Sequence, residues 1–254
     1  MIKILLPRWT LSVFISGLFF LGAGPASAQI RVIIANPVEE AIHTLAEEFE
    51  RTTGNAVAVE AMGTSALNML LESDEVADIV IGTTGNIDQA VANGHAAAAK
   101  TYVARVGVGI IVREGAPIPD ISTVDALRQA ALDANGVIYN TAGSGQNVDR
   151  MFAGLGIGDQ VTPKSARPRN AGETMDRMMA GQGMEIGFGL LSEIRPYEGN
   201  GIELIGRLPE ELQSYLTYEG IVLQRSGAPA VAREFLQFMT TENAREKFAA
   251  TGVD

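Results

Sequence analysis

The sequence predicts an α/β protein of two lobes, each a mixed, mostly parallel sheet flanked by helices. Short apolar runs rich in β-branched residues alternate with helical patterns, and 254 residues exceed what one open sheet needs. Chains of this length commonly divide into units of roughly 100 residues or more. Because no Pro-, Gly- or Ser-rich linker separates two halves, we expect strands to cross between the lobes. The expected division is residues 29–107 with 214–254 as lobe 1, and residues 108–213 as lobe 2.

The first 28 residues have the three parts of a secretory signal peptide. Lys3 and Arg8 give a positive start, residues 11–21 are apolar, and residues 26–28 (ASA) form a small-residue cleavage site. A single membrane anchor is the alternative, but the apolar stretch is shorter than the ~20 residues that cross a bilayer. We therefore expect residues 1–28 to be removed on export, leaving a periplasmic protein that does not span the membrane.

The first half of the remaining chain alternates strands and helices three times. Apolar residues at helical spacing, such as Ile42, Leu45 and Phe49, mark the first helix, and Gly54 is placed to end it. The expected order is strand 31–35, helix 38–53, strand 56–60, helix 65–72, strand 78–81 and helix 87–93.

A longer β-rich run at residues 103–112 breaks this rhythm. Beyond it, Ser122 or Thr123 is placed to cap a helix, and short apolar runs again mark strands between helical patterns. The expected elements are helix 122–134, strand 137–139, a helix ending near 155, helix 173–180, strands 185–189 and 202–205, an extended run 218–224, and helices 229–239 and 241–250.

The composition excludes several classes of function. The absence of Cys excludes disulfides, iron–sulfur clusters, thiolate zinc sites and cysteine nucleophiles. The two histidines, His43 and His95, are far apart in sequence, so we expect no metal centre. A formal net charge of −11 without clustered Lys or Arg argues against nucleic acid as a partner. Removal of Lys3 and Arg8 on export would make the chain more acidic still.

The sequence contains no pattern typical of an enzyme. It lacks the GxSxG elbow of hydrolases and the GxxxxGK[ST] phosphate loop, and His43 lies within an expected helix. Paired carboxylates at residues 47–48 and 210–211 have the pattern of solvated helix faces. We therefore expect no catalytic residue, no cofactor and no enzymatic activity; turnover of a bound ligand would identify the alternative, a secreted enzyme.

Small polar residues follow several of the expected strands, where the next helix begins. Ligands bind beyond the carboxyl ends of strands in open α/β sheets, and helix N-termini offer free N–H groups and a partial positive charge to anions. The alternative is that these residues are ordinary helix caps. The candidate ligand contacts are Asn36, Pro37, Thr64, Ser65, Thr83, Ser144, Gly145, Gln146 and Asn170.

Arg105 is the exceptional charge, because it lies inside the apolar run at residues 103–112. It either reaches outward to water or pairs with an acid such as Asp78, or its guanidinium faces an anionic ligand where the lobes meet. Both interpretations stay open, and Arg105 is added to the candidate site. Arg167 and Arg169 are expected to be loop charges.

Several stretches of the chain resemble molybdate-type periplasmic solute-binding proteins of ABC importers, which have the type II periplasmic binding protein fold. They are residues 41–54, 57–67, 77–81 (ADIVI), 208–212 (LPEEL), 217–221 (TYEGI) and 229–253, so the resemblance covers nearly the whole chain after the signal peptide. It implies two α/β lobes that close around an oxyanion. The anion would be held by hydroxyls, backbone N–H groups and a tyrosine.

The chain departs from this family at two ligand positions. The serine of the first turn is replaced around Asn36 and Pro37, and the tyrosine expected after residues 187–189 is Leu190. The second-turn hydroxyls are kept as Thr64 and Ser65. The resemblance is therefore to a divergent branch of the family.

The function expected from these observations is capture of a small anion in a cleft between the lobes and delivery to an ABC permease in the inner membrane. A molybdate-like oxyanion is favoured over a small organic di- or tricarboxylate, which Arg105 would suit better. A solute sensor for a membrane receptor is the further alternative. We expect a monomer.

Overall fold

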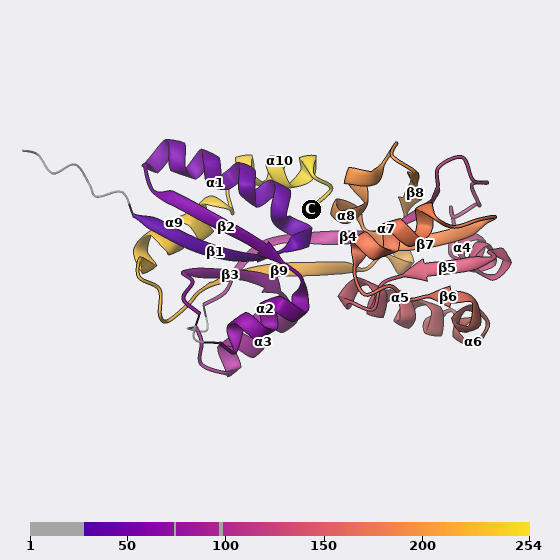
Figure 1. The fold of residues 1–254 in the computed structure, drawn as a ribbon, viewed down its shortest axis with the longest axis horizontal. Coiled ribbons are helices and arrows are strands. Elements are labelled where there is room, and N and C mark those ends of the chain that lie inside the picture. The colour runs from indigo at the N-terminus through magenta and orange to yellow at the C-terminus, as the bar shows by residue number, and fades with distance from the viewer. Residues whose placement is uncertain (1–27, 74, 97–98) are drawn as a thin grey trace, which may run out of the picture.

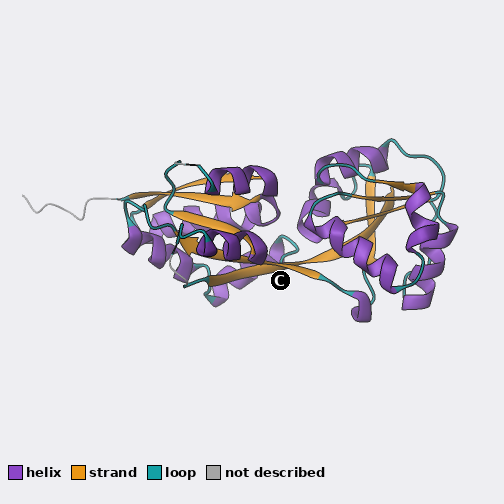
Figure 2. Ribbon diagram, turned by 90° about the horizontal axis from the view of Figure 1, so that it is seen from below, coloured by secondary structure: helices purple, strands orange, loops and turns teal. Residues whose placement is uncertain are grey.

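The computed structural model describes residues 28–73, 75–96 and 99–254, which form two lobes. Figure 1 shows one lobe built from both ends of the described chain and the other from its middle. Figure 2 shows that strands run from one lobe into the other. The predicted two-lobe α/β class is thereby confirmed, whereas the predicted signal peptide, apart from Ala28, lies outside the described residues.

Lobe 1 contains the strand order β2–β1–β3–β9–β4, in which β1 is parallel to β2 and β3, and β9 is antiparallel to β3 and β4. Its elements are β1 (Gln29–Ala35), η1 (Asn36–Val38), α1 (Glu39–Thr53), β2 (Ala56–Met62), α2 (Thr64–Leu71), β3 (Ile79–Thr83), α3 (Thr84–Ala92), β9 (Tyr215–Val222), α9 (Pro229–Phe238) and α10 (Glu242–Ala250).

Lobe 2 has β5 parallel to β6 and β7, with β4 antiparallel to β7 and β8. Its elements are β4 (Thr101–Arg113), α4 (Val124–Asp133), β5 (Gly136–Tyr139), α5 (Gly143–Gly154), α6 (Gly158–Val161), η2 (Thr162–Lys164), β6 (Ser165–Ala166), α7 (Ala171–Met179), β7 (Glu185–Leu190), α8 (Leu191–Ile194), η3 (Arg195–Tyr197), β8 (Ile202–Arg207) and η4 (Glu210–Leu212).

Strand β4 belongs to both lobes, which explains the length of the β-rich run in the sequence. Its first half, up to Gly107, pairs with β9, and its second half, from Val108, pairs with β7 and β8. The predicted lobe limits at residues 107 and 213 fall at this crossing and, as domain limits, stay a prediction.

Helices cover both faces of each sheet, because apolar side chains along each strand point alternately to one face and to the other. Ile34 packs in the cluster that holds α1, α9 and α10, whereas its neighbour Ile33 packs in the cluster of α2 and α3. In lobe 2, Ile110 and Ile111 divide in the same way between the α4–α5 side and the α7–α8 side. No helix among the described residues is long and apolar enough to cross a membrane.

The sequence did not predict three short elements, β6, α6 and α8. Strand β6 has two residues, and α6 and α8 have four each, so none is long enough to show a period of 2.0 or 3.6 residues. Their existence depends on tertiary contacts. Helix α8 lies against η1 of the other lobe and so bears directly on the site.

Asp78 joins β1, β3 and the start of α9. Its buried carboxylate accepts hydrogen bonds from the Arg31 N–H (2.8 Å), the Ser226 hydroxyl (2.6 Å) and the Ala228 N–H (3.3 Å). Burial acts to raise the pKa of Asp78, but the hydrogen bonds outweigh it and hold this pKa below its usual value. The carboxylate therefore stabilises the fold above the pKa of an unfolded Asp, and this stability is lost as the pH falls through the lower folded pKa.

We expect Asp78→Asn to lower the free energy of unfolding by about 2 kcal/mol at pH 7, because an amide replaces a charged acceptor. Urea denaturation measures this, with Asp176→Asn, at an exposed carboxylate on α7, as the control. The difference from wild type should shrink at acidic pH. An equal difference at pH 7 and at acidic pH would contradict the assigned role of the charge.

Candidate functional site

A cleft of about 630 Å³ lies between the lobes and collects residues from the ends of several strands. A second hollow, of about 420 Å³, adjoins it and shares five of its lining residues, Asn36, Pro37, Ala171, Gly172 and Glu193. The main cleft is lined by Ala35, Asn36, Pro37, Met62, Gly63, Thr64, Ser65, Ala66, Asn140, Ala142, Gly143, Ser144, Arg169, Asn170, Ala171, Gly172, Leu190, Glu193, Leu216 and Tyr218. Six of the ten predicted site residues are among them.

The lobe 1 wall of the cleft is the first turn of α2. Helix α2 begins at Thr64 after the extended residue Gly63, and no side chain caps it. Thr64 and Ser65 are exposed, and within the described residues their hydroxyls have no hydrogen-bond partner. The backbone N–H groups of this turn precede the first intrahelical bonds and are likewise free to donate. This turn can therefore offer hydroxyls and N–H groups to one anionic group.

The facing wall in lobe 2 is the turn from β5 into α5, which is organised by Asn140. The buried Asn140 Oδ1 accepts hydrogen bonds from the N–H groups of Ala142 (3.0 Å) and Gly145 (3.2 Å). Asn140 Nδ2 also lies 3.2 Å from Ser144 Oγ. The Gly145 N–H is therefore already hydrogen-bonded to Asn140. The donors that α5 can offer a ligand are the N–H groups of Gly143 and Ser144.

The second lobe 2 donor group is the start of α7. Asn170 caps this helix through Oδ1, which accepts from the Glu173 N–H at 2.9 Å. Asn170 lines the cleft, and its amide nitrogen has no hydrogen-bond partner within the described residues. Beside it, the exposed Arg169 is paired with Glu173, with Nε to Oε1 at 2.9 Å. Among the described residues that line the cleft, Arg169 is the one with a positively charged side chain.

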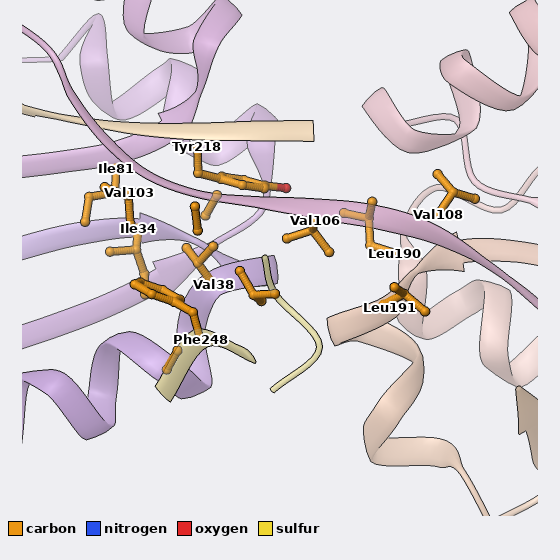
Figure 3. Close-up of a cluster of buried hydrophobic side chains, with 14 of the residues drawn as sticks. Ile34, Val38, Ile81, Val103, Val106, Val108, Leu190, Leu191, Tyr218 and Phe248 are labelled. Atoms are coloured by element: carbon orange, nitrogen blue, oxygen red, sulfur yellow. The ribbon is translucent and has the colours of Figure 1, made fainter. Parts of the chain in front are cut away.

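The family resemblance placed a tyrosine of the site at the end of β7, at residue 190. In this chain a phenol is supplied instead by Tyr218 of β9. Figure 3 shows its ring above the buried cluster, with the hydroxyl directed toward the Leu190 side of the junction. Leu190 and Tyr218 both line the cleft. The predicted loss of a tyrosine at Leu190 is real in sequence, but a tyrosine from a different strand reaches the cleft.

Glu193 of α8 is an acid within the cleft. It lines both hollows, and its carboxylate has no hydrogen bond or ion pair within the described residues. Burial raises the pKa of Glu193 to about 7. Burial first, and then the charge of Glu193, raise the pKa of Tyr218 well above its ordinary value. Both residues line the cleft.

Four predicted site residues do not line the cleft. Thr83 caps α3 in a reciprocal pair with Asn86, and Gln146 is exposed on α5. Gly145 is buried against Asn140. Arg105 is exposed, with its guanidinium carbon 4.3 Å from the centre of the Tyr215 ring.

Strand alternation explains the position of Arg105. Ala104 pairs with Tyr218 and Val106 with Leu216, and Tyr218 and Leu216 line the cleft. Arg105 pairs with Thr217, so its side chain is on the opposite face. The structure fits the interpretation in which Arg105 reaches outward to water. Arg105 does not pair with Asp78.

Sequence reasoning missed Asn140, Arg169, Glu193 and Tyr218 as cleft residues. Asn140 had a signal, because it directly follows an expected strand. Tyr218 and Glu193 had none of comparable strength. Glu193 lies on a four-residue helix, and Tyr218 reaches the cleft only because β9 crosses beside β4. Within the described residues, no group of three or more His, Asp or Glu side chains could hold a metal ion.

The chain is similar to known proteins in sequence and in fold. The chain is 28% identical over 239 residues to an aconitate isomerase from Pseudomonas sp., covering 92% of this chain and 90% of that protein. Its fold is similar to the periplasmic molybdate-binding protein of Azotobacter vinelandii (TM-score 0.70, 15% identity, 89% of this chain and 98% of that chain). It is also similar to PEB3 of Campylobacter jejuni with bound L-phospholactate (TM-score 0.70, 14% identity, 88% and 98%).

The strongest of these findings is the match of residues 30–254 to a family model described as bacterial extracellular solute-binding protein. That range includes all of both lobes except the first residue of β1, and it includes all the residues that line the cleft. The chain belongs to the bacterial extracellular solute-binding protein family.

Proposed function

We propose that this protein captures a small organic di- or tricarboxylate in the cleft between its lobes and delivers it to an ABC permease. The observation that carries the proposal is the separation of the donor groups over a cleft of about 630 Å³. The first turn of α2 lies on one side, and the starts of α5 and α7 lie on the other. Separate donor groups suit a ligand with several carboxylates.

The charged residues of the cleft support an organic acid over a tetrahedral oxyanion. Arg169 can pair with a carboxylate, and a protonated Glu193 can donate a hydrogen bond to one. The relative from Pseudomonas sp. is named after aconitate, which is an unsaturated tricarboxylate. These points reverse the preference that the sequence suggested, and we infer aconitate or a similar polycarboxylate as the ligand.

A molybdate-like oxyanion is the second candidate. The hydroxyls of Thr64 and Ser65, together with free backbone N–H groups, can bind an oxyanion without a formal positive charge. The molybdate-binding protein of Azotobacter vinelandii has the same fold, although at 15% identity. Export through residues 1–28, a periplasmic location, action as a monomer and the absence of a membrane-spanning segment after cleavage are parts of the same proposal.

A calorimetric and thermal-shift comparison of trans-aconitate, cis-aconitate, citrate, molybdate, tungstate and sulfate tests the ligand class. We expect the polycarboxylates to raise the melting temperature, because a ligand that binds the folded state stabilises it. Binding of molybdate or tungstate with no response to any polycarboxylate would overturn the proposal and establish the oxyanion alternative.

The first turn of α2 is tested by Thr64→Val, which removes a hydroxyl and keeps the shape of the side chain. We expect the dissociation constant for the polycarboxylate to rise about tenfold or more, since a hydrogen bond to a charged group contributes about 1.5–3 kcal/mol. Thr52→Val, at an exposed threonine near the end of α1, is the matched control and should leave affinity unchanged. Equal affinities of the two variants would remove Thr64 from the site.

A further inference from the structure

Ligand capture uses the Glu193 carboxyl only in its protonated form and gives no role to the ionised form. A solute-binding cleft for anions gains from donors, whereas an ionised carboxylate repels the ligand. Glu193 nevertheless lines both hollows and has no cation or hydrogen-bond donor within the described residues to neutralise it. An unpaired acid that faces the ligand is more typical of proton-transfer sites than of anion traps.

The groups around Glu193 form a partly closed environment at the junction of the lobes. Helix α8 lies against η1, so Glu193 is held between the start of lobe 1 and the body of lobe 2. Its neighbour Ser192 has a buried hydroxyl without a partner among the described residues. Tyr218 comes from the crossing strand β9 and lines the same cleft as Glu193. A ligand in the cleft would therefore meet a carboxyl and a phenol together.

We propose that Glu193 moves a proton between two carbon atoms of a bound unsaturated polycarboxylate, so that the cleft catalyses migration of its double bond. This inference rests on the proposed polycarboxylate ligand and departs from the sequence-based expectation of no enzymatic activity. It assigns Glu193 as the catalytic residue and Tyr218 as a donor to the carboxylate on which charge develops.

The reaction balances without a cofactor or a second reactant. The Glu193 carboxylate removes a proton from a methylene carbon next to the C=C bond, and the electrons of that C–H bond move into the conjugated C=C–COO⁻ system. Glu193, now protonated, returns the proton to the far carbon of the former double bond, and the double bond is left one position along. The enzyme ends in its starting protonation state, and the substrate keeps all of its atoms.

The described residues supply the other requirements of such a step. The α2 turn and the starts of α5 and α7 can hold the carboxylates, which fixes the carbon chain relative to Glu193. A carboxyl with a pKa near 7 is well matched to general acid–base catalysis at neutral pH. The Tyr218 hydroxyl can donate to the developing negative charge.

The test incubates the purified protein with trans-aconitate or cis-aconitate in D₂O and follows both isomers by proton NMR. We expect interconversion of the isomers, with deuterium entering the methylene position in those turnovers in which the Glu193 carboxyl exchanges its proton with D₂O before returning it. Glu193→Gln should lower the rate at least about 100-fold while calorimetry shows that aconitate still binds. Glu234→Gln, at an exposed glutamate on α9, is the matched control and should keep the full rate.

The outcomes separate this inference from the proposed function. Binding of aconitate by the wild-type protein with neither conversion nor deuterium exchange would overturn the proton transfer and leave polycarboxylate capture standing. An unchanged rate in Glu193→Gln would exclude Glu193 as the proton carrier. Failure of the protein to bind any polycarboxylate would overturn both.

Discussion

Gly145→Ala is expected to destabilise the protein by about 3 kcal/mol and to weaken polycarboxylate binding strongly. A Cβ atom at position 145 would lie 1.7 Å from the backbone oxygen of Asn140, a distance that no van der Waals contact permits. The obstacle is backbone, so the start of α5 or the preceding turn has to shift by more than an ångström, and overpacking on a smaller scale already costs about 1–3 kcal/mol.

The same shift would disturb the ligand donors at this end of the helix. The Gly145 N–H donates to Asn140 Oδ1 at 3.2 Å, and this bond sets the turn that exposes the N–H groups of Gly143 and Ser144. We therefore expect affinity to fall at least about 100-fold, which corresponds to the loss of two hydrogen bonds to a charged group.

Gly154→Ala provides the matched control within the same helix. No atom lies within 4 Å of a Cβ at position 154, and the backbone there is not left-handed. Alanine should stabilise α5 by up to about 1 kcal/mol, because glycine has the lower helix propensity. Urea denaturation and calorimetry of both variants measure the contrast. Wild-type stability in Gly145→Ala would show that the close approach to Asn140 is not required.

The fold was predictable because its signals are local. The apolar run of β1, the helical spacing in α1 and the small polar turns at strand ends are each visible within a few residues of sequence. Ligands bind beyond the carboxyl ends of the strands in open α/β sheets, so the turn at Thr64 in lobe 1 and the turn at Ser144 in lobe 2 could each be predicted as ligand positions. Both turns line the cleft.

The rest of the site depends on pairings between distant segments. Whether Arg105 faces the cleft depends on which residue of β9 lies opposite, and the pairing Arg105–Thr217 is not visible in either strand alone. A shift of one residue would have exchanged Arg105 with its buried neighbours. Tyr218 enters the cleft through the same register, and Glu193 through a helix too short to show a period.

Polycarboxylate affinity is expected to fall as the pH rises above 7, by up to tenfold per pH unit. The pKa of Glu193 is raised to about 7 by burial, so its carboxyl is largely protonated at pH 6 and ionised at pH 8. The protonated form donates a hydrogen bond to a bound carboxylate, whereas the ionised form repels it. Binding therefore takes up a proton above pH 7, and affinity decreases as the pH rises.

Other titratable groups line the two hollows together with Glu193. They are Glu39, Glu40, Arg169, Tyr197 and Tyr218. All of them are present in both the wild-type protein and Glu193→Gln, so a comparison of the two proteins isolates the contribution of the Glu193 carboxyl.

Glu193→Gln removes the titrating group and keeps a donor at the same position, so its affinity should be nearly independent of pH between 6 and 8.5. The wild-type protein should bind roughly 30-fold more weakly at pH 8.5 than at pH 6. Calorimetry in buffers of different ionisation enthalpy would also detect the proton taken up by the wild-type protein and its absence in the variant. Turnover should have the opposite pH dependence, since proton abstraction requires the ionised form. Parallel pH profiles of affinity in the two proteins would show that the Glu193 carboxyl does not face the ligand.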